Sequence, residues 1–172
     1  MRDLFLMRHA KSSWNLKYLD DFDRPLNKRG RKAAELMAKW LSDEGISPDL
    51  TICSTACRTT ETVNIMSESG FLTRDLQFIQ SLYHADLKTL FSLARGVDAE
   101  VRSLLVIGHN PSMFQFFYNL LLRGDSFILS KFPTAAFAHF SVPIDDWGKL
   151  EPKSATLTGF MTPKQLQSLV TD

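Results

Sequence analysis

The chain has 172 residues, of which 44% are hydrophobic and 23% charged, as is typical of a globular protein. We expect one domain spanning residues 1–172. The formal net charge of +1 gives no overall attraction to nucleic acid or to an anionic membrane. The apolar stretch at residues 4–7 is too short for a signal-peptide core or a membrane span, so we expect a cytoplasmic protein.

The first half of the chain alternates strand and helix patterns. Residues 4–7 form a continuous apolar run, which is typical of a strand buried on both faces. Asn27 can cap a helix that continues to about Glu44 and ends at Gly45, with Ala33, Met37, Trp40 and Leu41 on its apolar face. Residues 50–53 read as a second strand. A second helix should then begin near Thr55 or Ala56 and stop before Gly70.

The alternation continues through the second half. Strands are expected at residues 76–79 and 104–107, with a short helix at 87–95 between them. Asn110-Pro111 reads as a cap residue followed by proline at the first position of a fourth helix. Residues 136–142 and 155–157 look like antiparallel edge strands, and 163–170 like a terminal helix. This order predicts an α/β fold, a three-layer, doubly wound and mostly parallel sheet with helices on both faces.

Two further sequence features have ordinary explanations. Cys53 and Cys57 lack further ligands at zinc spacing, so we expect two reduced thiols and no metal. A basic cluster lies before and within the start of the first helix. Without interleaved aromatic residues, it is better explained as a solvated face that helps to attract anionic substrates than as a nucleic-acid site. Its members are Arg24, Lys28, Arg29, Arg31 and Lys32.

Three of the expected strands end in cationic or titratable side chains. The first runs into Arg8-His9 and the fourth into Gly108-His109, while the second leads to Arg58 on the first turn of a helix. In a doubly wound sheet these ends share one crevice, and a helix N-terminus there attracts anions. The resulting group of two arginines and two histidines should contain no neighbouring carboxylate.

Such a group suits a phosphoryl substrate. Guanidinium groups match phosphate oxygens and stay charged at any working pH. Like charge lowers the pKa of a histidine held between arginines, which leaves a nitrogen lone pair free to attack. Each residue alone is more often structural, but the four together favour phosphoryl transfer.

The chain resembles the histidine phosphatase superfamily, which includes the phosphoglycerate mutases. The resemblance rests on four stretches in order, LMRHAKSSWN from Leu6, RPLNKRG from Arg24, STACRTTET from Ser54 and GHN from Gly108. The RHA-K opening, the LYHA at residues 82–85 and the short chain are most similar to the SixA-type phosphohistidine phosphatase branch.

The resemblance implies that His9 is the nucleophile and forms a phosphohistidine that water then hydrolyses. It implies that Arg8, Arg58 and His109 bind the phosphoryl group, and that Asn15 adds a hydrogen bond. It implies no metal or organic cofactor. The partner would be a phosphoprotein or a small phosphorylated substrate, and the resemblance favours phosphohistidine in a protein.

One position departs from the family pattern. Many members carry a general acid, Glu or Asp, just after the third strand, where this chain has Ser81. His84 or Asp86 could donate the proton instead, or the labile phosphohistidine could need little help. The short connection to the next helix also lacks the lid of larger relatives, which suits a phosphoryl group presented on a protein surface.

Alternative functions stay open at this stage. A phosphomonoesterase acting on small esters and a non-catalytic phosphate- or phosphoprotein-binding module share the same pocket residues. A phosphoglycerate mutase is disfavoured by the short chain and the missing acid. A cysteine phosphatase is rejected, because only four residues separate Cys53 from Arg58 where that class has five.

Overall fold

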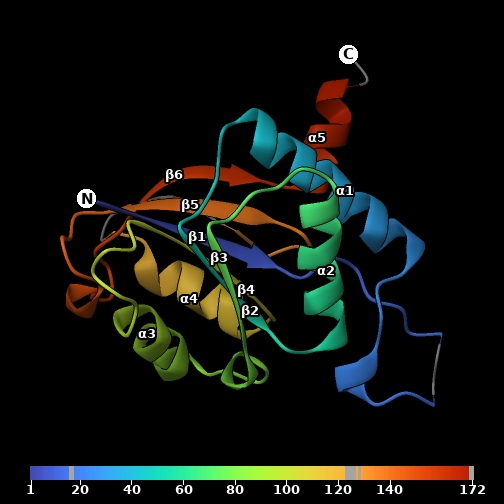
Figure 1. Ribbon diagram of the computed structural model, residues 1–172, viewed down its shortest axis with the longest axis horizontal. Coiled ribbons are helices and arrows are strands. Elements are labelled where there is room, and N and C mark those ends of the chain that lie inside the picture. The colour runs from blue at the N-terminus through green and yellow to red at the C-terminus, as the bar shows by residue number, and fades with distance from the viewer. Residues whose placement is uncertain (16–17, 123–126, 128, 171–172) are drawn as a thin grey trace.

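One mixed six-stranded sheet organises the chain. The computed structural model describes residues 1–15, 18–122, 127 and 129–170, and its sheet has the order β3-β2-β4-β1-β5-β6 (Figure 1). The strands are β1 (Arg2–Arg8), β2 (Leu50–Ser54), β3 (Asp75–Ile79), β4 (Ser103–Gly108), β5 (Phe137–Val142) and β6 (Thr156–Met161). The first four strands pair in parallel, whereas β5 and β6 add an antiparallel edge beside β1. The prediction of a mostly parallel sheet with an antiparallel edge is confirmed.

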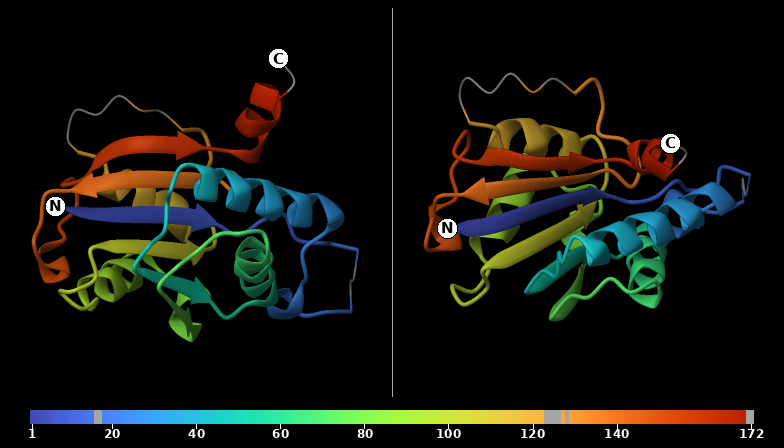
Figure 2. Two further views of the ribbon diagram at one scale, coloured as in Figure 1. Left: turned by 45° about the horizontal axis from the view of Figure 1, so that its top comes forward. Right: turned by 90° about the horizontal axis from the view of Figure 1, so that it is seen from above.

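Helices cover both faces of this sheet. They are α1 (Lys28–Asp43), α2 (Cys57–Glu68), α3 (Leu87–Arg95), α4 (Ser112–Leu120) and α5 (Pro163–Val170). The views in Figure 2 place α1 and α2 on one face and α3 and α4 on the other, which gives the expected three layers. Three short 3-10 helices, η1 (Asp21–Asp23), η2 (Gln80–Leu82) and η3 (Trp147–Lys149), lie in the connections. Among the described residues, no helix has both the length and the apolar character needed to cross a bilayer.

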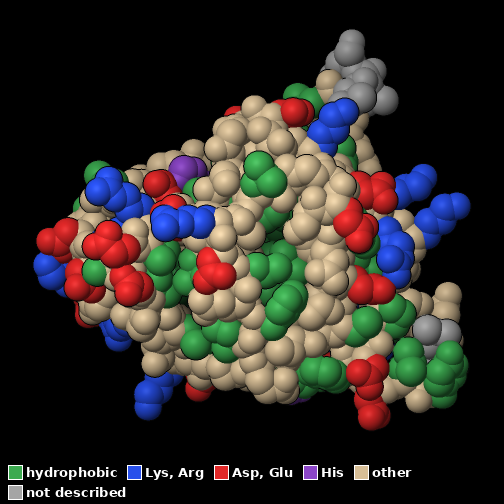
Figure 3. Space-filling model, viewed as in Figure 1, with side chains coloured by type: hydrophobic (Ala, Val, Ile, Leu, Met, Phe, Trp, Pro, Cys, Tyr) green, Lys and Arg blue, Asp and Glu red, His purple; other side chains and the backbone are tan. Residues whose placement is uncertain are grey.

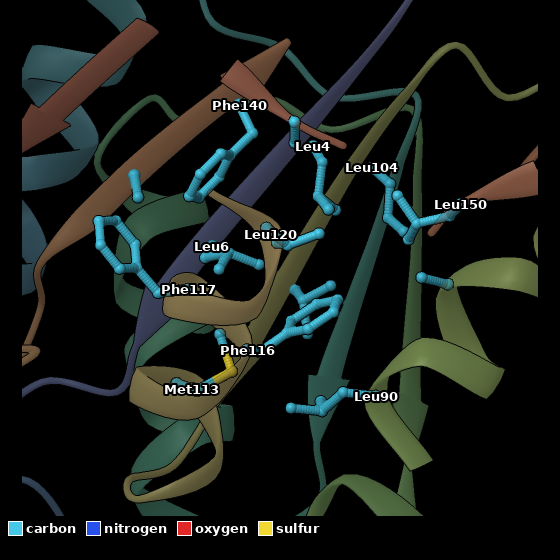
Figure 4. Close-up of a cluster of buried hydrophobic side chains, with 14 of the residues drawn as sticks. Leu4, Leu6, Leu90, Leu104, Met113, Phe116, Phe117, Leu120, Phe140 and Leu150 are labelled. Carbon is cyan, nitrogen blue, oxygen red and sulfur yellow. The ribbon is translucent and has the colours of Figure 1, made fainter. Parts of the chain in front are cut away.

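Strand periodicity divides the buried side chains into two cores. Successive side chains of a strand point to opposite faces, so Leu4 and Leu6 of β1 pack with α3 and α4, while Phe5 and Met7 pack with α1 and α2. Figure 4 shows the α4 side, where Phe116 and Phe117 meet the leucines of the sheet. The central strands are continuous hydrophobic runs because each of their two faces packs against a layer of helices. This packing on both sides fixes the positions of the strand ends.

Local sequence signals explain most helix boundaries. Asn27 accepts a hydrogen bond from the Gly30 backbone N–H at 2.8 Å and begins α1, and Gly45, at φ 67°, follows its end. The prediction for α3 matches the structure from Leu87 to Arg95.

The predicted start of the fourth helix is wrong. Pro111 occupies the N-cap position of α4 rather than its first turn, and the Asn110-Pro111 peptide is cis. The Asn110 side chain makes no cap bond. Its amide nitrogen donates instead to the carbonyl oxygen of Phe132 at 3.0 Å, which ties the β4 end to the chain before β5.

The first turn of α1 packs directly on the chain that follows β1. A Cβ atom on Gly30 would lie 2.1 Å from the carbonyl oxygen of Lys11, and this close neighbour is backbone that cannot rotate away. We therefore expect Gly30→Ala to lower the free energy of unfolding by at least about 2 kcal/mol through overpacking. Urea titration measures the change.

Gly96→Ala is the matched control. Gly96 has a φ of −81°, and its nearest neighbour to an added Cβ is 3.4 Å away, so its substitution should change stability by no more than about 0.5 kcal/mol. Equal losses in the two variants would contradict the close-packing argument.

Candidate functional site: a cationic pocket at the strand ends

The pairing of β1 with β4 brings the two predicted histidines together. Arg8 pairs with Gly108 in the parallel register, and the His9 N–H donates to the Gly108 carbonyl at 3.1 Å. His9 and His109 therefore leave adjacent strands at the same edge, with their ring centroids 5.1 Å apart. Both side chains are buried, with 6% and 7% of the residue surface exposed.

The second strand supplies Arg58. After β2 ends at Ser54 the chain turns into α2, and Arg58 occupies the second position of that helix, buried to 5% exposure. The structure confirms that the four predicted residues lie in one crevice, namely Arg8, His9, Arg58 and His109. All four line one pocket of about 580 Å³.

The hydrogen bond made by His9 determines which ring nitrogen is free. Nδ1 lies 2.7 Å from the carbonyl oxygen of Ala10. A carbonyl oxygen only accepts, so Nδ1 carries the ring proton and Nε2 keeps its lone pair. Burial lowers the pKa of His9 to about 3, and the charges of Arg58 and Arg8 add to the effect. Like charge was expected to be the cause, but loss of hydration is the larger one.

His109 is held by a residue that sequence reasoning missed. Its Nε2 lies 2.8 Å from the Ser54 hydroxyl, which also accepts from the Ala56 N–H at 3.3 Å. We assign the hydroxyl proton to the bond with Nε2, which places the ring proton on Nδ1. That Nδ1 is buried and has no partner among the described residues. Burial, followed by the Arg58 charge, lowers the pKa of His109 to about 3, so the ring is neutral.

The expectation that no carboxylate adjoins the cluster is wrong. Asp21, from η1, lines the pocket and accepts from the Arg58 Nη2 at 3.0 Å. The Tyr83 hydroxyl donates to the same oxygen, Oδ2, at 3.0 Å, while the other oxygen, Oδ1, pairs with Arg24 at 2.8 Å. Burial would raise the pKa of Asp21, but the Tyr83 hydrogen bond and the Arg58 charge outweigh it and hold the pKa below its usual value.

The positive end of the helix dipole disfavours an arginine in the first turn of a helix, and Asp21 compensates for this at Arg58. The guanidinium groups of Arg8 and Arg58 nevertheless keep donors that are available to a ligand. The Nε atoms of Arg8 and Arg58 are buried and unpartnered among the described residues, and one Nη of Arg8 donates to Phe132 O at 3.0 Å. An anion entering the pocket can satisfy these donors.

Of the three less central predicted residues, His84 lines the pocket and the other two do not. Asn15 is exposed and is not among the pocket-lining residues, so its hydrogen bond to a phosphoryl group stays a prediction. Asp86 caps α3, where its carboxylate accepts from the Thr89 N–H at 2.8 Å, and it does not line the pocket. His84 does line it, at the exposed mouth, with its ring 3.9 Å from that of Tyr83.

Helix α2 anchors the site to its surroundings. The Thr62 hydroxyl accepts from the Ala10 N–H at 3.0 Å, and Glu61 accepts from the Leu26 N–H at 2.6 Å. Glu61 also pairs with Arg31 of α1 at 2.7 Å. One helix therefore fixes both the chain after His9 and the segment that carries Asp21.

The thiols are not organised for catalysis. Cys53 is fully buried on β2, its Sγ donates to the Ser54 carbonyl, and burial raises its pKa. A cysteine nucleophile needs the thiolate form, so the structure agrees with the rejection of a cysteine phosphatase. Both cysteines are free, as expected.

Comparison with known proteins identifies the class. The model of the histidine phosphatase superfamily (branch 1) matches residues 4–80. An uncharacterized protein of Mycobacterium leprae is 32% identical over 166 residues, which cover 92% of this chain and all of that protein.

Solved structures agree with this assignment. A candidate phosphohistidine phosphatase SixA from Agrobacterium tumefaciens is 30% identical, with a TM-score of 0.78 over 94% of this chain and 99% of that one. Its counterpart from Nakamurella multipartitia is 26% identical, with a TM-score of 0.82 over 94% and 96%. The chain belongs to the histidine phosphatase superfamily, in its SixA-type branch, and is a phosphatase.

The low pKa values of the two site histidines can be tested directly. We expect the rings of His9 and His109 to remain neutral at pH 5, with Nε2 unprotonated in ¹⁵N NMR spectra, because protonation of the second ring nitrogen would bury an unhydrated cation. The unfolded chain takes up these protons near pH 6.5, as ordinary histidines do. The free energy of unfolding should therefore fall as the pH drops from about 6.5 towards 3. A midpoint near 6.5 for His9 in the folded protein would contradict the assignment.

The Ser54 hydroxyl should matter through the His109 tautomer. Ser54→Ala leaves Nε2 without its partner, and we expect kcat for an aryl phosphate to fall about 10-fold, since the proton on Nδ1 is no longer fixed. The ¹⁵N shifts of the His109 ring should show mixed tautomers.

Ser112→Ala is the control for this experiment. Its buried hydroxyl donates to the backbone carbonyl of His109 at 2.9 Å and does not touch the ring. We expect kcat to stay within about twofold in this variant. A similar loss in both variants would mean that Ser54 only supports packing.

Proposed function

We propose that the protein removes the phosphoryl group from phosphohistidine in a protein, with His9 as nucleophile. The observation that carries the proposal is a neutral, buried His9 whose Nδ1 proton is held by Ala10 and whose Nε2 lone pair is free beside two guanidinium groups. Because the ring is already neutral, this nucleophile needs no second residue to deprotonate it.

In the first step Nε2 of His9 attacks phosphorus and the bond to the leaving group breaks. Arg8 and Arg58 neutralise the charge on the phosphoryl oxygens, and the His109 Nδ1–H adds a donor. The Ala10 carbonyl stabilises the positive charge that develops on the His9 ring, because it accepts a hydrogen bond from the Nδ1–H.

In the second step water attacks the phosphorylated His9. The P–Nε2 bond breaks, its electron pair returns to the ring, and the proton lost by water leaves with the phosphate. A ring nitrogen of low basicity is a good leaving group, so the burial that keeps His9 neutral also favours this step.

The proton donor for the leaving group is expected at the opening of the pocket. Asp21 is ionised and Asp86 caps a helix, which leaves His84 as the candidate donor. His84 has a φ of 58°, an unusual backbone conformation for a residue with a side chain, and such outliers concentrate at functional sites. A protonated phosphohistidine loses its imidazole readily, so its cleavage places a small demand on this group.

The approach to the pocket favours a phosphoryl group carried on a protein. The described connection between β3 and α3 is residues 80–86, without an inserted lid. At the rim, Trp14 is 72% exposed and its ring lies 3.5 Å from the Arg24 guanidinium carbon. An exposed aromatic ring beside the opening can contact a partner surface. The SixA-type relatives support the same substrate class.

His9→Ala is the decisive variant, measured against a panel of phosphohistidine protein, aryl phosphate and sugar phosphates. We expect loss of turnover by at least about 10³-fold on every substrate, because the covalent intermediate cannot form. The protein without substitutions should retain acid-labile phosphate on His9 after rapid quenching. It should turn over the phosphohistidine protein faster than the aryl and sugar phosphates.

Cys53→Ser is the control and should remain active. Residual activity in His9→Ala would overturn the nucleophile assignment. Equal or better turnover of sugar phosphates would instead identify a phosphomonoesterase, and binding without turnover of any substrate would identify a phosphate-binding module.

A further inference from the structure

A second hollow opens from the wall of the catalytic pocket. It has a volume of about 500 Å³ and shares Arg8, Lys11 and Thr134 with the first. Its other walls come from the first turn of α1, from the chain before β5 and from the start of α5, which packs beside α1 (Figure 1). A group seated there is therefore an immediate neighbour of a bound phosphoryl group.

The lining of this hollow is strongly cationic. Of the ten described residues that line it, five are basic, namely Arg8, Lys11, Arg29, Lys131 and Lys164, and none is Asp or Glu. The remaining residues are alanine, proline and threonine. The whole chain has a formal net charge of only +1, so this concentration is local. In Figure 3, Lys and Arg side chains gather at the end of the molecule where α1 begins.

The cations of this hollow form no ion pair with a described carboxylate, unlike two arginines nearby. Arg24 pairs with Asp21, and Arg31 pairs with Glu61. Within residues 1–15, 18–122, 127 and 129–170, no carboxylate forms an ion pair with Lys11, Arg29 or the two lysines at 131 and 164. Arg24 and Arg31 are thus neutralised by carboxylates, whereas the cations of the hollow keep their charge available to a ligand.

We propose that this basic hollow binds an acidic segment of the phosphoprotein substrate, next to the phosphorylated histidine. The proposal rests on the proposed function and adds a specificity determinant to it. Charge complementarity identifies the occupant. Carboxylate side chains beside the phosphohistidine would enter a hollow whose positive charges are not neutralised by the protein. Exposed lysines at its rim also attract such a segment over a distance of about 10 Å at moderate salt.

The test compares two phosphohistidine peptides that differ only in their flanks, one with glutamates and one with glutamines. The intact protein should cleave the glutamate peptide with a kcat/KM about 10-fold higher at low salt, and added salt should shrink this preference. In Lys131→Glu/Lys164→Glu the preference should vanish. Hydrolysis of an aryl phosphate, which is too small to reach these lysines, should stay within about twofold.

Lys39→Glu/Lys88→Glu is the matched control. Both lysines are exposed, neither lines the two hollows, and the charge change is the same. This variant should keep the preference for the glutamate peptide. The inference is overturned if the intact protein shows no preference, if the control loses it too, or if Lys131→Glu/Lys164→Glu slows all substrates equally.

A further measurement separates this inference from the proposed substrate. If every variant hydrolyses aryl phosphate but none cleaves either phosphohistidine peptide, the substrate assignment fails. The hollow is then judged by competition with unphosphorylated peptides. The glutamate peptide must inhibit aryl phosphate hydrolysis more strongly than the glutamine peptide, and only in proteins that retain Lys131 and Lys164; otherwise the hollow is a solvated basic surface.

Discussion

The parallel register between β1 and β4 is the constraint on which the site depends. It places the residues after Arg8 and Gly108 side by side at one sheet edge, and so joins segments that are 100 residues apart in the chain. Because side chains alternate between faces, a slip of one residue would exchange the contents of the two cores. The apolar packing on both sides of β1 thus fixes the positions of His9 and His109.

The same burial determines the chemistry of the pocket. Removing the two histidines from water keeps them neutral, while the two arginines stay charged. Within the described part of the chain, the pocket therefore holds donors without a partner, at the Nε atoms of Arg8 and Arg58 and at the His109 Nδ1. Buried donors without acceptors are unfavourable, so an anion that supplies acceptors stabilises the folded protein as it binds.

The sequence was sufficient for those parts of the site that follow from regular structure. Arg8, His9, Arg58 and His109 lie at strand ends or on a first helical turn, and hydrophobic periodicity locates both. Asp21 was missed because it lies in an irregular connection, where no periodicity relates it to Arg58. Ser54 was missed because a hydroxyl at a strand end has no special pattern of its own.

Some residues can serve either of two purposes, and sequence alone does not choose between them. Asp86 is a candidate proton donor, but an aspartate just before a helical run is also an N-cap, and the structure shows its carboxylate in the cap. Asn110-Pro111 matched a cap followed by proline, yet the asparagine bonds across to Phe132 instead. Local signals leave such choices open, and tertiary contacts decide them.

The contacts of helix α2 with several parts of the site affect how the geometry of the pocket can change during evolution. It presents Arg58 to the pocket while Glu61 and Thr62 bond the segments that carry Leu26 and Ala10. A small displacement of this one helix would move a phosphate ligand, the rim and the chain next to His9 together. Substitutions on its outward face can therefore adjust the whole pocket as a unit, so variation among relatives is best sought there and in the basic hollow rather than among the four central residues.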